Sequence, residues 1–284
     1  MSIDPTRVGA SVGPVVSSWD ARDCMLYALS VGACMDNATG PELRFVTENT
    51  RDVELVALPT MATVLGGVLT APSPLAQIGD YDRRKSVHGS VELELHRPLP
   101  TAATIESTIT VDGIFDKRSG ALVVLRVDAS DASGPVFTIR NGIFVRDEGG
   151  FGGEPGPAWR GGATPEETPT AVTSMVTRVE QPLLYRLNGD RNPLHSDPAV
   201  AAAAGFEQPI MHGLCTLGFV GRALIAYACE GDPSRVARIG ARFSTPVVPG
   251  DTIVIRIWPR ADDVFFAAYV GDRPVLSAGY LTIR

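Results

Sequence analysis

The chain has 284 residues, of which 44% are hydrophobic and 20% charged, and its formal net charge is −7. This is the composition of a globular protein, and it excludes a disordered or membrane-embedded chain. The acidic balance argues against general nucleic-acid binding, which requires a basic face. The length allows one large domain or two of about 140 residues each.

The sequence shows no sign of a targeting, membrane or metal-binding segment. The first residues, Met1 to Pro5, lack the basic and then apolar pattern of a signal peptide. The longest apolar run, near Met61 to Leu69, is too short to span a bilayer. The cysteines form no C-x-x-C pair and resemble buried apolar side chains in a reducing compartment; they are Cys24, Cys34, Cys215 and Cys229. We therefore expect a soluble cytoplasmic protein without a metal site.

The first half predicts one helix and then strands. Asp20 is a suitable N-cap for a helix over Ala21–Ala33, because apolar residues recur there at helical spacing. Two later segments, His88–Pro98 and Thr104–Val111, are typical of β-strands. Glycine and proline then dominate residues 148–170, which predicts a flexible linker between the two halves of the chain.

The second half repeats this order weakly. The segment Val236–Pro246 aligns with His88–Pro98 at an offset of 148 residues, and Thr252–Trp258 follows at the same offset as another expected strand. A helix is predicted from Gly213 to Tyr227, with leucine and valine side chains on one face. In this helix Gly218 and Gly221 would allow the backbone to approach a sheet closely.

A loop before this helix holds the most informative residues. Tyr185 to Pro198 has the sequence YRLNGDRNPLHSDP, in which glycine and proline indicate a shaped loop. Asp190 and His195 are five positions apart with Asn192 between them. A carboxylate and an imidazole held together can grip a water molecule and move a proton. The plain alternative is a polar turn with a surface histidine. A short helix should follow, capped by Ser196 or Asp197.

This fourteen-residue string resembles the signature of the hydratase 2 family, also called MaoC-like dehydratases, which includes (R)-specific enoyl-CoA hydratases. Leu26–Ala33 also resembles the family's first helix, so the likeness covers about residues 15–145 and 175–284. It implies an α+β double hotdog fold, in which an antiparallel sheet in each half wraps a long central helix. Residues 1–147 would be a degenerate hotdog that binds the acyl chain and coenzyme A. Residues 148–170 would link it to a catalytic hotdog at 171–284.

The resemblance also implies an activity, the reversible addition of water to a trans-2-enoyl-CoA in fatty-acyl or related lipid metabolism. Asp190 and His195 correspond to the catalytic pair that grips one water molecule, and Asn192 to the residue that orients the water or the pair. Gly213, eighteen residues after His195, matches the glycine whose N–H meets the thioester oxyanion. A helix that starts at Gly213 would also direct its positive dipole end at this oxygen.

Four further residues match family positions that contact the bound thioester. These are His88 and Gly89, Lys117 at the coenzyme A phosphates, and Phe243 near the adenine or pantetheine. A solvated lysine in a turn and a half-buried strand aromatic are the ordinary alternatives for the last two. His212, beside Gly213, is expected to be structural because His195 already fills the position of the catalytic histidine.

The implied partner is an acyl-CoA or acyl-carrier-protein thioester, with no cofactor beyond the coenzyme A of the substrate, no nucleic acid, no membrane, and a homodimeric assembly. Two alternatives stay open. A hotdog thioesterase needs a carboxylate on the central helix, and Gly213–Tyr227 has none. A non-catalytic acyl-CoA-binding subunit would not need Asp190 and His195. Fatty, branched and steroid side-chain acyl groups all fit the sequence, as do both directions of the reaction.

Overall fold

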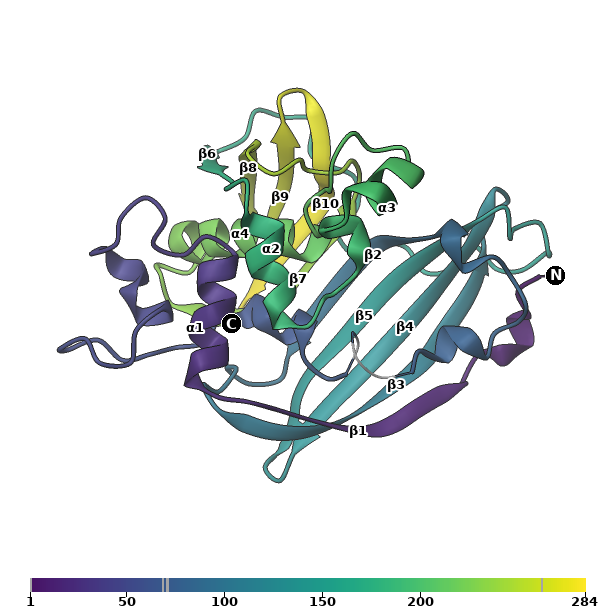
Figure 1. Cartoon of the computed structure of the whole chain (residues 1–284), viewed down its shortest axis with the longest axis horizontal. Helices are drawn as coiled ribbons and strands as arrows, with labels where there is room; N and C mark the ends of the chain where they lie inside the picture. The colour runs from purple at the N-terminus through teal and green to yellow at the C-terminus, as the bar shows by residue number, and fades with distance from the viewer. Residues whose placement is uncertain (1, 68, 70–71, 262) are drawn as a thin grey trace.

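A computed structural model describes residues 2–67, 69, 72–261 and 263–284. Its main feature is one continuous ten-stranded antiparallel sheet, in the order β1-β3-β4-β5-β2-β7-β10-β9-β8-β6 (Figure 1). The first half contributes β1 (Ser11–Trp19), β2 (Ser86–Leu95), β3 (Ala103–Asp116), β4 (Gly120–Asp131) and β5 (Gly134–Arg146). The second half contributes β6 (Ala171–Val176), β7 (Val236–Phe243), β8 (Thr252–Arg260), β9 (Asp263–Val270) and β10 (Arg273–Ile283).

The order of the strands is the same in both halves. Counted from the outer edge, β1, β3, β4, β5 and β2 correspond to β6, β8, β9, β10 and β7. The two halves meet where β2 pairs with β7, and Leu93 lies opposite Ile239 in this pairing. The repeat in the sequence therefore reflects two equivalent sheets. The repeated segments form β2 and β7, and these two strands join the sheets. The double hotdog prediction is confirmed.

In the part of the chain that the structure describes, four α-helices and several short 3-10 segments accompany the sheet. The α-helices are α1 (Ala21–Ser30), α2 (Gln181–Tyr185), α3 (Pro198–Ala203) and α4 (Gly213–Ala228). The 3-10 segments are η1 (Pro5–Arg7), η2 (Pro41–Phe45), η3 (Pro59–Val64), η4 (Pro74–Ala76), η5 (Arg83–Lys85), η6 (Arg186–Asn188), η7 (Pro193–His195) and η8 (Pro233–Arg235). Among the described residues, no helix is both long enough and apolar enough to cross a bilayer.

The helix ends follow local signals. Asp20 caps α1, and the side chains of Asp20 and Asp23 each accept the backbone N–H of the other. The helix ends at Ser30, three residues before the predicted end, and Gly32 follows with a left-handed φ of 82°. At α3, Asp197 rather than Ser196 is the cap, since its side chain accepts the N–H groups of Ala199 and Val200.

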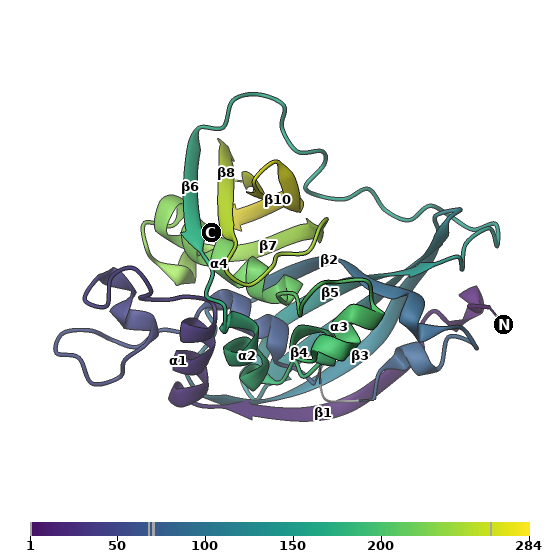
Figure 2. The same cartoon turned by 45° about the horizontal axis from the view of Figure 1, so that its top comes forward.

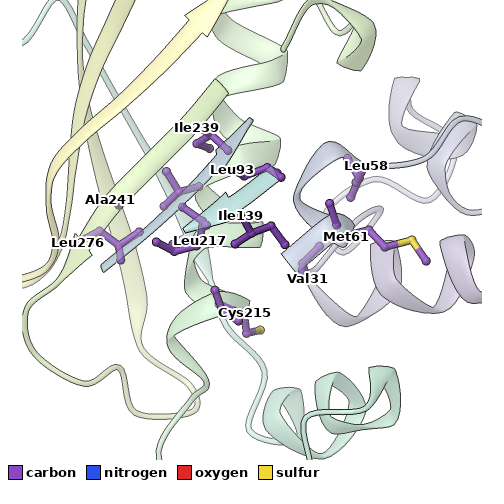
Figure 3. Close-up of a cluster of buried hydrophobic side chains, with 14 of the residues drawn as sticks. Val31, Leu58, Met61, Leu93, Ile139, Cys215, Leu217, Ile239, Ala241 and Leu276 are labelled. Atoms are coloured by element: carbon purple, nitrogen blue, oxygen red, sulfur yellow. The ribbon is translucent and has the colours of Figure 1, made fainter. Parts of the chain in front are cut away.

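The core forms around α4, which packs against β7, β8 and β10 as well as against η3. Figure 3 shows Leu217 of α4 beside Ile239 of β7 and Leu276 of β10, with Leu93 of β2 and Ile139 of β5 close by. All five of these side chains are at most 1% exposed. Each contributes about 1.5–3 kcal/mol through burial, so the same cluster that holds α4 also joins the two halves.

Gly218 and Gly221 of α4 lie closest to other segments than the predicted sheet. A Cβ on Gly218 would lie 2.4 Å from Val31 Cγ1, and one on Gly221 would lie 2.8 Å from Thr60 Cγ2. The close neighbours are thus the C-terminal end of α1 and η3. The prediction that Gly218 approaches a sheet closely is therefore wrong. Gly221 approaches a sheet only at Ile239 of β7, whose Cδ1 would lie 3.8 Å from the added Cβ.

The two halves differ in their helices. In the first half α1 has ten residues and contacts β1, α2 and η3, whereas α4 has sixteen residues. The segment η3 packs against both β2 and α4. The cysteines also differ slightly from expectation, because Cys34 is partly exposed while the other three are buried; all four are free thiols.

The predicted linker, residues 148–170, contains neither helix nor strand, but it is attached to both halves. The Asp116 carboxylate accepts the N–H of Gly150 at 2.9 Å. Further along, the Trp159 indole N–H donates to the Ala278 carbonyl at 2.7 Å, and Thr164 accepts the Ala278 N–H at 3.1 Å. The segment therefore crosses the molecule along a path that hydrogen bonds to both halves hold in place (Figure 2). The boundaries at 147 and 171 stay a prediction.

We expect residues 170–284 expressed alone to aggregate or self-dimerise, with little activity on long acyl chains. Removing the first half leaves β7 as an open sheet edge and exposes the apolar surface that Leu93 and Ile139 cover. Size-exclusion chromatography with light scattering gives the state of the fragment. Co-expression with residues 1–147 should restore a soluble complex. A monomeric and fully active fragment would show that the halves fold and act independently.

Candidate active site

The predicted catalytic loop is shaped by two short 3-10 turns. Gly189 ends η6 with a φ of 111°, a left-handed conformation that strongly favours glycine. Asn192 caps η7, since its side-chain oxygen accepts the Leu194 N–H at 3.1 Å, and Pro193 is the first residue of the turn. The backbone N–H of Asn192 also donates to Asp190 Oδ1 at 3.3 Å. The exposed Asn192 side chain thus has a structural partner, and its role in orienting water stays a prediction.

The imidazole of His195 is held in one orientation. Its Nδ1 lies 2.8 Å from the carbonyl oxygen of Ile210, so Nδ1 carries the proton and donates it. Nε2 is then left with a lone pair, ready to accept a proton. Ile210 lies just before α4, so this hydrogen bond connects the predicted catalytic loop to the start of this helix.

The environment brings the proton affinities of Asp190 and His195 closer together. Burial raises the pKa of Asp190 above its usual value, while the Asn192 N–H and the charge of His195 oppose this shift. Burial lowers the pKa of His195, against the hydrogen bond to Ile210 and the charge of Asp190. Because the two pKa values approach each other, moving a proton through a shared water molecule costs little free energy.

His212 contacts both of these residues. Its ring lies over that of His195, with centroids 3.8 Å apart and planes inclined by 30°. Its Nε2 lies 3.2 Å from the backbone carbonyl oxygen of Asp190. Burial lowers the pKa of His212 to about 3, so the ring stays neutral. The sequence does not predict these contacts of His212, and its position directly before Gly213 is the one signal that it offers.

The start of α4 lies close to residues of β7 and β2, the two strands that join the halves of the sheet. A Cβ on Gly213 would lie 2.9 Å from the ring of Phe243, at the end of β7. The Phe243 ring is in turn 4.8 Å from that of His88, near the start of β2. Gly89 follows His88 on β2. The N-cap residue His212 makes no side-chain capping bond to α4, so within the described residues its side chain leaves the first N–H groups of the helix free. The structure therefore brings Gly213, Phe243 and His88 together from three separate elements.

His88 is a neutral side chain with one unused nitrogen. Burial lowers the pKa of His88 to about 4. Its Nε2 is closed to solvent and has no hydrogen-bond partner within the described part of the chain. A buried polar atom without a partner costs about 1–3 kcal/mol, so such atoms favour sites that a ligand completes.

Lys117 lies in the exposed turn between β3 and β4, where its Nζ donates to the Pro155 carbonyl of the linker. The turn and the start of β2 are at the same end of the sheet, since Ala121 of β4 and Ser86 of β2 both lie opposite Val145 of β5. Two strand spacings separate β4 from β2, roughly 10 Å. Lys117 and His88 therefore lie at the same end of the sheet, and the phosphate contact stays a prediction.

We expect Lys117→Ala to weaken the binding of coenzyme A thioesters more than that of short pantetheine thioesters, which lack the phosphates that the ammonium group would meet. The measurement is KM for matched acyl groups on the two carriers. Lys117→Arg keeps the charge and should retain most of the affinity. An equal loss of affinity on both carriers would show that Lys117 only holds the linker in place through its bond to Pro155.

A groove of about 190 Å³ borders His195 on the surface. Its walls are mainly apolar; they include Val179, Pro182, Leu183, Pro209 and Pro249. A larger depression of about 500 Å³ lies over the sheet of the first half, beside Glu106, Asp128 and Thr138. It contains none of the predicted site residues, so we place the site at His195, where the chemical groups converge.

Comparisons with known proteins found relatives over most of the chain. Residues 161–278 match a family model described as a MaoC like domain, and residues 17–147 match the MFE-2 hydratase 2 N-terminal domain. The 3-hydroxyacyl-thioester dehydratase Y of Mycobacterium tuberculosis is 41% identical over 91% of this chain and 88% of its own. The peroxisomal enoyl-CoA hydratase 2 of Arabidopsis thaliana is 37% identical over 94% and 91%. A MaoC-like dehydratase structure from Phytophthora capsici aligns with a TM-score of 0.88 at 27% identity, covering 99% of this chain and 98% of that one.

Proposed function

The chain belongs to the MaoC-like dehydratase family, and on this premise we propose that it is an (R)-specific 2-enoyl-CoA hydratase, or a 3-hydroxyacyl-thioester dehydratase when the reaction runs in reverse. The observation that carries the proposal is the catalytic loop. Asp190 and His195 have converging pKa values, and the Ile210 carbonyl fixes the His195 tautomer. These features allow Asp190 and His195 to activate one water molecule.

The reaction needs two proton transfers. Water attacks the β carbon of the enoyl thioester as it loses a proton, and the α carbon gains one. The lone pair on His195 Nε2 and the Asp190 carboxylate lie on one loop and can hold the two hydrogens of the same water molecule. Either group can accept the proton that the water loses and then deliver it to the α carbon, while its partner keeps the hydrogen bond to the new hydroxyl group. The proton balance closes within the pair, so we propose that no cofactor takes part beyond the coenzyme A of the substrate.

Negative charge builds on the thioester oxygen during the attack. The N–H of Gly213, at the uncapped start of a sixteen-residue helix, is suited to stabilise this oxygen. A side chain at position 213 would collide with Phe243, so glycine keeps this approach open. His88, Gly89 and Phe243 would then line the path of the thioester, and Lys117 would meet the phosphates.

Hydration of crotonyl-CoA by the purified protein tests this function. We expect consumption of the enoyl thioester and formation of 3-hydroxybutyryl-CoA, with no release of free coenzyme A. Release of the free thiol would instead support the thioesterase alternative, which α4 disfavours because its sixteen residues include no Asp or Glu. Tight binding of acyl-CoA without turnover, over a series of chain lengths, would support a non-catalytic binding subunit.

The assembly and the cellular location belong to this proposal as well. We propose a homodimer acting on an acyl-CoA or acyl-carrier-protein thioester in the cytoplasm. Light scattering of the intact protein tests the dimer. The relative from Arabidopsis thaliana is a peroxisomal enzyme, so localisation by microscopy in the source cell is the test of the cytoplasmic assignment.

A further inference from the structure

Three aromatic rings form a stack beside the catalytic loop. His195 lies on His212 with centroids 3.8 Å apart, and His212 lies against Tyr185 at 4.8 Å. Tyr185 belongs to α2 and is fully buried, where it also meets Tyr27 of α1 at 6.2 Å. One face of the catalytic imidazole is therefore supported by a column of rings that is anchored in the core.

The middle ring of this stack is also bonded to the other catalytic residue. His212 Nε2 lies 3.2 Å from the Asp190 carbonyl, which can only accept, so Nε2 carries the proton of this neutral ring and donates it. His212 is 1% exposed and precedes Gly213 directly. A single buried side chain thus contacts His195 through its face and Asp190 through its edge, and it is fixed in the chain next to the oxyanion glycine.

We propose that His212 is a positioning residue for the hydration reaction: it sets the plane of the His195 ring and the place of the Asp190 backbone relative to Gly213. The inference rests on the proposed function and adds a residue to it. It assigns His212 no contact with the substrate. Its effect is to keep the two proton-transfer groups of the loop in one arrangement around a shared water molecule.

The decisive variant is His212→Phe, which keeps an aromatic ring in the stack and removes the donor to Asp190. We expect kcat for crotonyl-CoA to fall about ten- to a hundredfold, the usual cost of a displaced catalytic group, while KM changes little. His212→Gln keeps an N–H donor on a side chain of similar length and should recover part of this loss. A loss in KM alone, or wild-type kcat in His212→Phe, would overturn the proposal.

A second-site test separates positioning from a direct role. If His212 acts through His195, adding His212→Phe to His195→Ala should cost little more than His195→Ala alone. Losses that multiply would show that His212 acts independently and would contradict the proposal. Phe219→Leu is the stability control, because it removes a buried aromatic from the same helix and should lower the melting temperature without changing kcat.

An NMR measurement makes the result independent of turnover. The chain has four histidines, so imidazole ¹⁵N signals can be assigned with single variants. We expect wild-type His195 to show one neutral tautomer, protonated at Nδ1, and His212→Phe to show a mixture of tautomers. An unchanged His195 signal in His212→Phe would refute positioning even if the variant is slow. If the wild type failed to hydrate any enoyl thioester, the proposed function would fail while this readout would still report on His212.

Discussion

Asp190→Asn and His195→Ala should each lower the rate of crotonyl-CoA hydration by at least about a hundredfold without unfolding the protein, because each removes a group that accepts or delivers a proton. Asn at 190 keeps the shape of the side chain and can still accept the Asn192 N–H, so a slow variant would point to the lost proton transfer. The measurements are kcat for hydration and the melting temperature.

Two matched controls make the same kinds of change outside the proposed pair. Asp197→Asn makes the same chemical change seven residues away, at an exposed position where asparagine is an equally good helix cap, and should leave kcat unchanged. His96→Ala removes an exposed histidine at the far end of the β2 segment and serves the same purpose. The variant that lacks both Asp190 and His195 should be little slower than the single variants, because the two act as a unit. Near wild-type turnover in either single variant would contradict the assignment.

The parts of this structure that the sequence predicted are those set by local signals. Asp20 and Gly213 mark the starts of α1 and α4 because capping and helix initiation depend on a few consecutive residues. The strands β2 and β7 were found by their repeat, since equivalent positions of two similar halves carry similar side chains. The end of α1 was missed because Gly32, though a possible C-cap, lies within an apolar pattern that continues to Ala33.

Side-chain contacts between segments far apart in the sequence could not be predicted from the sequence. The linker was expected to be flexible from its glycine and proline content, but composition says nothing of a single indole such as Trp159 that reaches the carbonyl of Ala278. The same holds for His212. Its stacking on His195 depends on the path of the sixteen residues between them. Its bond to Asp190 uses a backbone carbonyl, which every residue possesses, so no sequence pattern predicts it.

The remaining large effect concerns stereochemistry: hydration should give only the (R)-3-hydroxyacyl product. Asp190 and His195 lie on one loop, and the Ile210 carbonyl and the ring of His212 restrain the His195 imidazole. A water molecule held by this pair approaches one face of the enoyl plane. If Gly213 fixes the thioester oxygen, as we propose, the substrate cannot turn its other face toward the water, so one configuration at the β carbon results.

Coupled assays measure this directly. An (R)-specific 3-hydroxyacyl-CoA dehydrogenase added to the hydration reaction should produce NADH, and an (S)-specific enzyme should produce none. Chiral chromatography of the hydrolysed product is the independent check. A racemic product would mean that the thioester is not fixed at Gly213, because both faces would then reach the same water molecule. An (S) product would mean that the water held by Asp190 and His195 meets the other face of the enoyl plane, and it would refute the (R) assignment together with the proposed arrangement of the pair and Gly213.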